Sequence, residues 1–316
     1  MKILITGSSG FIGFHLSKKL LKLGHHITGV DNFSDYYDVG LKKKRTKKLT
    51  HSNFNFVNLD INDLRKLNGS FDLAINLAAQ AGVRLPLSKH KLYKTTNEKG
   101  FKNFLDYCVY NNIDKAIYAS SSSVYCDETN KKFCEDSSKL LPKSNYGKSK
   151  LNNEQYAAKF FKENKISLIG LRFFSVYGPW GRPDMAYYLF TEALKNNLEI
   201  VLHNQGTMAR DMTYIDDVIL GIVGAINFLT NNKKCTNEIF NLGNSRPIET
   251  KKMLNYIEKY LGKKARLKNL VTTNESYRTH ANIEKSKKYL NYTPKVNFEE
   301  GMKSFLDWHE KYISNE

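Results

Sequence analysis

Short apolar runs alternate with amphipathic stretches along the first half of the chain. We predict strands over 3–6, 27–30, 54–57, 73–76, 116–119 and 168–171, because each run is short and apolar. The stretches between the runs carry apolar residues at helical spacing. This alternation is typical of α/β proteins with a doubly wound parallel sheet.

Helices are predicted over 11–23, 91–111, 145–163, 185–196, 215–229, 250–261 and 298–312. After Phe174 the alternation loosens, and residues 178–183, Gly-Pro-Trp-Gly-Arg-Pro, indicate an irregular loop. We therefore expect a second, smaller lobe built from later residues. The segments 213–230 and 239–242 are expected to return to the main sheet.

A glycine-rich turn follows the first predicted strand. Gly7, Gly10 and Gly13 lead into the first helix, and the second strand ends at Asp31 and Asn32. This order of strand, turn, helix, strand and acid binds a pyrophosphate at a helix N-terminus. The first glycine permits the turn, the second lets the backbone approach the phosphates, and the third allows close packing. The alternative is a flexible loop in an unrelated α/β domain.

The carboxylate of Asp31 predicts which dinucleotide binds. It is expected to accept hydrogen bonds from the adenosine ribose hydroxyls, and it would repel a 2′-phosphate, so NAD is favoured over NADP. The expected fold is a Rossmann-type domain over 1–174, with 212–243 returning to it. Residues 175–211 and 244–316 are expected to form a substrate-binding lobe.

A tyrosine and a lysine lie one helical turn apart in the predicted helix 145–163. Tyr146 and Lys150 point the same way, and Ser120–Ser123 follow the strand before that helix. A neighbouring ammonium would stabilise the phenolate, and each unit of pKa lowering needs about 1.4 kcal/mol. We expect Tyr146 to act as a general base on a substrate hydroxyl, with a serine hydroxyl alongside.

The net charge of +18 would suit a protein that binds nucleic acid. Residues 42–48, Lys-Lys-Lys-Arg-Thr-Lys-Lys, are the densest cationic segment. Lysine far outnumbers arginine, however, and arginine suits bidentate phosphate recognition. We therefore expect solvated lysine-rich helix faces and no nucleic-acid partner.

Other classes of partner and site are not indicated by the sequence. No apolar run approaches the ~18 residues of a membrane span, and the apolar start leads into the glycine turn instead of a signal peptide. The four cysteines and eight histidines show no spacing typical of a metal site or a disulfide framework. We expect a cytoplasmic protein with no metal and no membrane partner.

Seven stretches of the sequence together resemble the extended short-chain dehydrogenase/reductase family. Within it the chain is similar to the NAD-dependent nucleotide-sugar epimerases, and the nearest likeness is to UDP-glucuronate 4-epimerases. The matching stretches are TGSSGFIGFHLSKKLL, DNFSDYYDVGL, NLAAQAGVR, YASSSSVY, LRFFSVYGPWGRPDM, RDMTYIDDV and FNLGNS. The resemblance implies NAD as cofactor, a UDP-sugar as substrate and a homodimer formed through the helices predicted over 91–111 and 145–163.

The resemblance also implies roles for particular residues. Tyr146 is then the catalytic base, Lys150 holds the nicotinamide ribose and tunes the phenol, and Ser121 is the bridging hydroxyl. The cofactor-binding positions are Gly7, Gly10, Phe11, Ile12, Gly13, Asp31, Asn32, Asp60, Ile61, Leu77, Ala78, Ala79, Tyr146, Lys150 and Phe173. The substrate-binding positions are Arg84, Ser122, Ser175, Arg182 and Arg210. The guanidinium of Arg182 would hold the sugar carboxylate bidentately. For each arginine the alternative is an ordinary surface ion pair.

The implied reaction is 4-epimerisation of UDP-glucuronate to UDP-galacturonate through a 4-keto sugar. An epimerase for UDP-glucose or UDP-N-acetylglucosamine is the main alternative. Related dehydratases carry Asp-Glu where Ser122 and Ser123 stand, and related decarboxylases carry Glu at the second position, so both are less favoured. A non-catalytic NAD-sensing protein is disfavoured because the Tyr/Lys pair is intact. One departure, residues 272–276 in place of Pro-Gly-Asp-Val, falls in a substrate-side loop.

Overall fold

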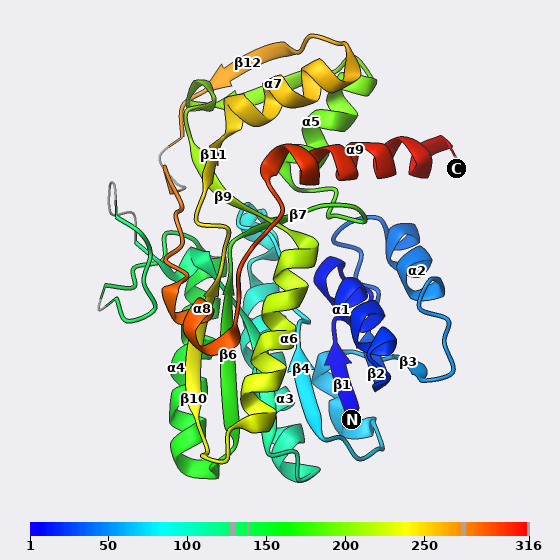
Figure 1. Cartoon of the computed structure of the whole chain (residues 1–316), viewed down its shortest axis with the longest axis vertical. Coiled ribbons are helices and arrows are strands. Elements are labelled where there is room, and N and C mark those ends of the chain that lie inside the picture. The colour runs from blue at the N-terminus through cyan, green and yellow to red at the C-terminus, as the bar shows by residue number, and fades with distance from the viewer. Residues whose placement is uncertain (127–130, 138, 273–275, 315–316) are drawn as a thin grey trace.

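The computed structural model describes residues 1–126, 131–137, 139–272 and 276–314 (Figure 1). A central sheet of seven parallel strands has the order β10-β6-β5-β4-β1-β2-β3. The strands are β1 Lys2–Thr6, β2 His26–Asp31, β3 Phe54–Asn58, β4 Leu73–Asn76, β5 Lys115–Ser121, β6 Ser167–Phe173 and β10 Asn237–Leu242. Because β1 lies between β2 and β4, the strand order reverses there, which opens a crevice at the carboxyl ends of the strands. The predicted doubly wound parallel sheet is confirmed.

Helices cover both faces of this sheet. They are α1 Phe11–Lys22, α6 Ile215–Asn231, α3 Gly100–Tyr110 and α4 Asn145–Asn164. Successive residues of β1 point to opposite faces: Ile3 and Ile5 belong to one buried cluster with α1 and α6, and Leu4 belongs to another with α3 and α4. A parallel strand buried on both faces reads as an unbroken apolar run, which is why the sequence predicted these strands well.

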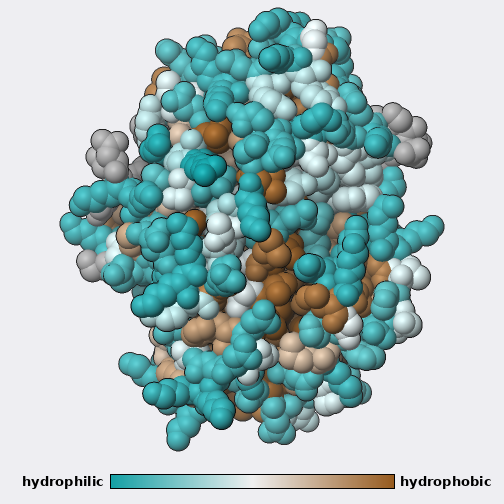
Figure 2. Space-filling view, viewed as in Figure 1, coloured by the Kyte–Doolittle hydropathy of each residue, from teal (hydrophilic) through white to brown (hydrophobic). Residues whose placement is uncertain are grey.

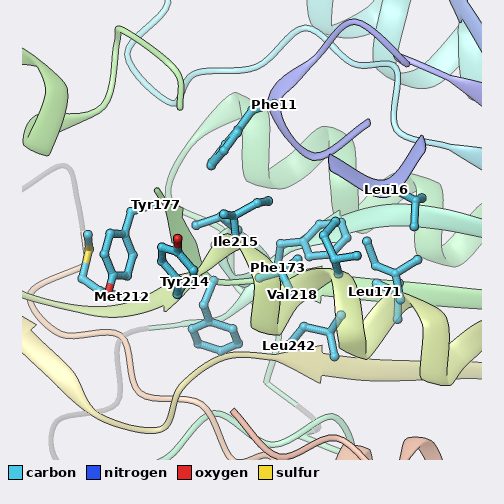
Figure 3. Close-up of a cluster of buried hydrophobic side chains, with 14 of the residues drawn as sticks. Phe11, Leu16, Leu171, Phe173, Tyr177, Met212, Tyr214, Ile215, Val218 and Leu242 are labelled. Atoms are coloured by element: carbon cyan, nitrogen blue, oxygen red, sulfur yellow. The ribbon is translucent and has the colours of Figure 1, made fainter. Parts of the chain in front are cut away.

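The first cluster continues from the sheet into the smaller lobe. Figure 3 shows Phe173, Ile215 and Val218 packed together, with Tyr177 and Met212 in the same cluster. The two parts of the molecule therefore share one continuous apolar core.

The smaller lobe lies at the top of Figure 1 and contains two small sheets. One has the order β11-β9-β7, with β7 Ser175–Tyr177, β9 Ala209–Tyr214 and β11 Pro247–Glu249; the other pairs β8 Glu199–His203 with β12 Arg266–Leu270. The remaining α-helices are α2 Val39–Lys47, α5 Ala186–Lys195, α7 Thr250–Leu261, α8 Glu284–Leu290 and α9 Phe298–Ser314. Short 3-10 turns are η1 Ile61–Lys66, η2 Leu87–Lys89, η4 Ser122–Val124 and η5 Asn204–Gly206.

The helix predicted over 91–111 is not uniform. It is α-helical at Lys91 and Leu92, then runs as a π-helical segment, η3 Tyr93–Lys99, and is α-helical again from Gly100. The wide turn holds Asn97 inward, where its Oδ1 accepts a hydrogen bond from Gln80 N at 2.8 Å and its Nδ2 donates to Ser149 Oγ at 3.0 Å. These contacts tie the segment to the loop after β4 and to α4, and periodicity could not predict them.

Hydrophilic side chains cover most of the face shown in Figure 2. Hydrophobic side chains gather in its lower middle, where α1 and α6 pack side by side in Figure 1. Across the described residues, no helix is both long enough and apolar enough to cross a membrane.

Candidate active site

A cleft of about 1690 Å³ lies at the carboxyl ends of the central strands, between the sheet and the smaller lobe. It is larger than the ~300–1,000 Å³ typical of one small-molecule pocket, so it has room for two ligands. Every residue to which the sequence assigned a role lines this cleft. No group of three metal-ligating side chains occurs within the ranges that the structure covers.

The glycine turn forms one wall of the cleft. Gly7 adopts a φ of +73°, and a Cβ on it would lie 2.6 Å from Ala78 N. A Cβ on Gly13 would lie 2.1 Å from Gly7 O, so α1 packs against the turn only because Gly13 has no side chain. The amide groups at the start of α1 are thereby brought to the cleft, which fits a dinucleotide pyrophosphate.

Acidic side chains follow the next two strands. The Asp31 carboxylate is buried and accepts hydrogen bonds from Ser9 N at 3.1 Å and Phe33 N at 2.9 Å. Burial raises its pKa above the ordinary value, against the lowering effect of Lys42 and of these amides. Asn32 Nδ2 donates to Asp60 Oδ2 at 2.6 Å, which joins two residues expected at the cofactor.

The serine run leaves β5 directly against the start of α4. Ser144 caps this helix by accepting a hydrogen bond from Gly147 N at 3.0 Å. A Cβ on Gly147 would lie 2.3 Å from Ser123 O, so glycine at this position permits the close approach. The approach brings Tyr146 within hydrogen-bonding reach of Ser121, as the resemblance implied.

The acidity of Tyr146 differs from our expectation. Burial raises its pKa above 10, while Arg182 and the hydrogen bond with Ser121 act in the opposite direction. The Lys150 ammonium donates to Ala119 O at 2.8 Å and lies 5.9 Å from the Tyr146 ring centre, and the lowering of the phenol pKa by Lys150 stays a prediction. Burial also lowers the pKa of Lys150 to about 8, against the attraction of Glu154.

The three arginines expected at the substrate make different contacts. Arg182 forms a two-point ion pair with Asp184, through Nε to Oδ1 at 3.0 Å and Nη2 to Oδ2 at 2.6 Å. Arg84 contacts His203 Nε2 through Nη1 at 3.2 Å, which links the loop after β4 to the smaller lobe across the cleft. Arg210 donates through Nη1 to Ala209 O at 3.1 Å.

The departure at 272–276 is described only at its two ends. Thr272 and Ser276 line the cleft, and residues 273–275 lie outside the described part of the chain.

Comparison with known proteins agrees with this geometry. The NAD dependent epimerase/dehydratase family matches residues 3–243. The chain belongs to this family. It is 38% identical over 331 residues to Protein CapI of Staphylococcus aureus, covering 99% of both chains. It is 40% identical over 334 residues to UDP-glucuronate 4-epimerase 4 of Arabidopsis thaliana, covering 99% of this chain and 76% of that protein.

A solved structure of similar architecture supports the same assignment. The crystal structure of UDP-glucuronic acid 4-epimerase from Bacillus cereus, in complex with UDP-glucuronic acid and NAD, superposes with a TM-score of 0.90. The two sequences are 33% identical, and the match covers 99% of this chain and 100% of the other. The resemblance inferred from the motifs is thus confirmed at the level of the family.

Sequence reasoning missed several charged residues around this epimerase-family cleft. Glu154 accepts from Arg172 Nε at 2.9 Å and Nη2 at 2.7 Å, and both side chains are buried behind the serine run. A Glu four residues after Lys150 was the available signal, because the two positions share a helix face. Asp184 could not be found by spacing, since its partner Arg182 lies in an irregular loop.

Proposed function

We propose that this protein is an NAD-dependent UDP-sugar 4-epimerase that converts UDP-glucuronate to UDP-galacturonate. The observation that carries the proposal is a single cleft in which Tyr146 and Ser121 meet beside the Arg182 guanidinium. The family membership and the similarity to UDP-glucuronate 4-epimerases support the reaction and the cofactor.

We assign the cofactor to the wall formed by the glycine turn. Gly7, Gly10 and Gly13 would hold the pyrophosphate, and Asp31 the adenosine ribose. The chemistry that NAD⁺ supplies when bound is hydride acceptance and return at the sugar C4, together with a positive ring charge. That charge acts on the Tyr146 phenol in the same direction as Arg182.

The residues of the chain handle the proton and the orientation of the sugar. Tyr146 takes the proton of the 4-hydroxyl, with Ser121 bridging the two oxygens, and gives it back after the 4-keto sugar has turned over. Lys150 contributes an ammonium behind the phenol. Arg182 holds the carboxylate near the plane of the 4-carbonyl, which disfavours loss of CO₂ from the β-keto acid.

The remaining substrate positions follow from the same assignment. We place Arg84, Ser122 and Ser175 at the sugar and Arg210 at the diphosphate. The dinucleotide-binding part is then 1–174 with 212–243, and the substrate-binding lobe is 175–211 with 244–316. A homodimer through η3, α3 and α4 and a cytoplasmic location remain predictions.

A UDP-glucose or UDP-N-acetylglucosamine epimerase is the second candidate. One observation favours it: Asp184 already neutralises the partly buried Arg182, so a neutral sugar would not face an unpaired cation.

The test is to incubate the purified protein and NAD⁺ separately with UDP-glucuronate, UDP-glucose and UDP-N-acetylglucosamine and to resolve the products by NMR. We expect UDP-galacturonate from the first. Turnover of only the neutral sugars would contradict the substrate, and CO₂ or a stable 4-keto product would contradict the reaction.

Tyr146→Phe is expected to lower kcat by about 10²–10⁴-fold, since it removes the base. Tyr156→Phe, the same change on the same helix but away from the cleft, is the matched control and should retain activity.

A further inference from the structure

Arg182 meets a carboxylate of its own chain at the edge that a substrate carboxylate would use. Its Nε and Nη2 atoms bind Asp184 Oδ1 and Oδ2 at 3.0 and 2.6 Å, in the loop between β7 and α5. Two parallel N–H···O bonds of this kind are the strongest geometry for a guanidinium and a carboxylate. In the protein without substrate, Asp184 thus occupies the Nε–Nη2 edge of the Arg182 guanidinium.

A second contact holds Asp184 from the opposite side of the cleft. Tyr36 Oη donates to Asp184 Oδ2 at 3.0 Å, the same oxygen that Arg182 Nη2 contacts. The Tyr36 hydroxyl fits here because Gly82 has a φ of +91° and no side chain; a Cβ there would lie 2.0 Å from Tyr36 Oη. Tyr36 therefore supports the carboxylate independently of Arg182.

The charges of this pair are balanced and lie close to the reacting phenol. Burial acts to raise the pKa of Asp184, but Arg182 and Tyr36 together hold it below its ordinary value. Arg182 lowers the pKa of Tyr146 and Asp184 raises it, which puts both charges within electrostatic range of the base. A sugar bound against Tyr146 is consequently bound against a neutral ion pair.

We propose that Asp184 is a specificity-determining residue that competes with the sugar carboxylate for the Nε–Nη2 edge of Arg182. With a neutral sugar Asp184 remains the counter-ion of the guanidinium, so binding leaves no unpaired charge in the partly buried site. With a sugar acid the substrate carboxylate takes over the edge, and Asp184 keeps its hydrogen bond from Tyr36. Asp184 therefore reduces the difference in binding affinity between UDP-sugars that carry a carboxylate and neutral UDP-sugars. This inference rests on the proposed function.

The experiment measures binding by calorimetry to the NAD-loaded protein, with UDP-glucuronate, UDP-glucose and UDP as separate ligands. In Asp184→Asn the ratio of the UDP-glucose Kd to the UDP-glucuronate Kd should rise by about tenfold or more. The Kd of UDP, which lacks the hexose or hexuronic acid on its diphosphate, should stay unchanged. Asp114→Asn, at an exposed aspartate paired with Lys115, is the matched control and should leave the ratio unchanged.

A second variant predicts the opposite sign. In the ion pair Tyr36 Oη shares Asp184 Oδ2 with Arg182 Nη2, whereas after displacement by a sugar carboxylate the Asp184 carboxylate has lost Arg182 and depends more on Tyr36. Tyr36→Phe therefore destabilises the displaced state more than the paired state, and the ratio should fall by a few-fold. This variant decides the matter if Asp184→Asn does not fold. An unchanged or reduced ratio in Asp184→Asn, or an unchanged or increased ratio in Tyr36→Phe, would overturn the inference.

Two failures are distinguishable. If the wild type binds and epimerises UDP-glucuronate but the ratios do not move as stated, only the role of Asp184 is wrong. If the wild type binds neither sugar nucleotide, both the inference and the proposed function are wrong.

Discussion

At the scale of single residues, Lys150 depends on a carboxylate outside the Tyr/Lys motif. Burial lowers the pKa of Lys150 to about 8, and Glu154, one turn further along α4, is the charge that opposes this. Glu154 is itself held by Arg172 and accepts a short hydrogen bond from Ser120 Oγ, next to Ser121 in the serine run. One buried carboxylate thus supports both the ammonium and the serine run.

Replacing Glu154 by Gln should narrow the pH range of activity. Without the anion the charged form of Lys150 is less favoured, so its pKa falls further and the ammonium is lost at a lower pH. The alkaline limb of kcat/KM against pH should move down by roughly one unit, while the acid limb stays in place. Arg172 loses its buried partner, and unfolding should become easier by about 3–5 kcal/mol.

The control for this prediction is Glu163→Gln, the same change at an exposed position of the same helix. Glu163 pairs only loosely with Lys159, at 3.8 Å, so neither the pH profile nor the stability should change appreciably. If the alkaline limb of the kcat/KM profile does not move in Glu154→Gln, the prediction is wrong and groups other than Glu154 keep Lys150 charged.

At the scale of elements, α2 has a role that its charge did not indicate. We expected the cationic segment 42–48 to form a solvated helix face, which is wrong for two of its members: Lys42 and Arg45 are buried. Arg45 donates to Trp180 O, Gly181 O, Ser9 O and the Tyr37 hydroxyl at 2.6 to 3.1 Å. The guanidinium of Arg45 therefore connects the loop that carries Arg182 to the glycine turn.

Arg45→Lys should weaken this connection although it keeps the charge. A lysine has three donors at one point and cannot reach carbonyls on both segments, so buried carbonyl groups lose their partners. We expect a loss of about 2–4 kcal/mol in the free energy of unfolding, measured in urea, and weaker NAD binding. The matched control is Arg65→Lys, at an exposed arginine, which should change neither quantity. Equal stability of the two variants would contradict a joining role for α2.

At the scale of the whole molecule, the proposed dimer surface combines apolar and cationic groups. Val109 and Tyr110 at the end of α3 are 43% and 72% exposed, which favours a partner there. Lys102, Lys148 and Lys159 are also exposed on α3 and α4, and the chain carries a net charge of +18. Two copies would therefore attract through apolar contact and repel through charge.

The dimer should accordingly tighten as salt is added. Raising the ionic strength from about 0.05 to about 0.5 M shortens the screening length well below 10 Å and weakens the repulsion. We expect the dimer dissociation constant from sedimentation equilibrium to fall several-fold. A monomer at both salt concentrations would rule out the dimer. Weaker association at high salt would point instead to ionic contacts.

The sequence by itself determined the central sheet, the glycine turn and the Tyr/Lys pair. Each of these features depends on residues that are close together in the sequence. Parallel strands buried on both faces are short apolar runs, and a helix places residues four positions apart on one face. The carboxyl ends of such strands meet at one edge, so residues after different strands were correctly expected to line one crevice.

Only the tertiary structure decided which charges meet. Arg182 with Asp184 and Tyr36, Arg45 with the loop at Trp180, and Lys150 with a backbone carbonyl all depend on how loops pack. The raised pKa of Tyr146 follows from burial, a property of the assembled cleft. The pattern of apolar and polar residues determines which face of its own helix or strand a side chain occupies. The strength of a charge interaction depends instead on which charged groups other elements place nearby and on how much water they exclude.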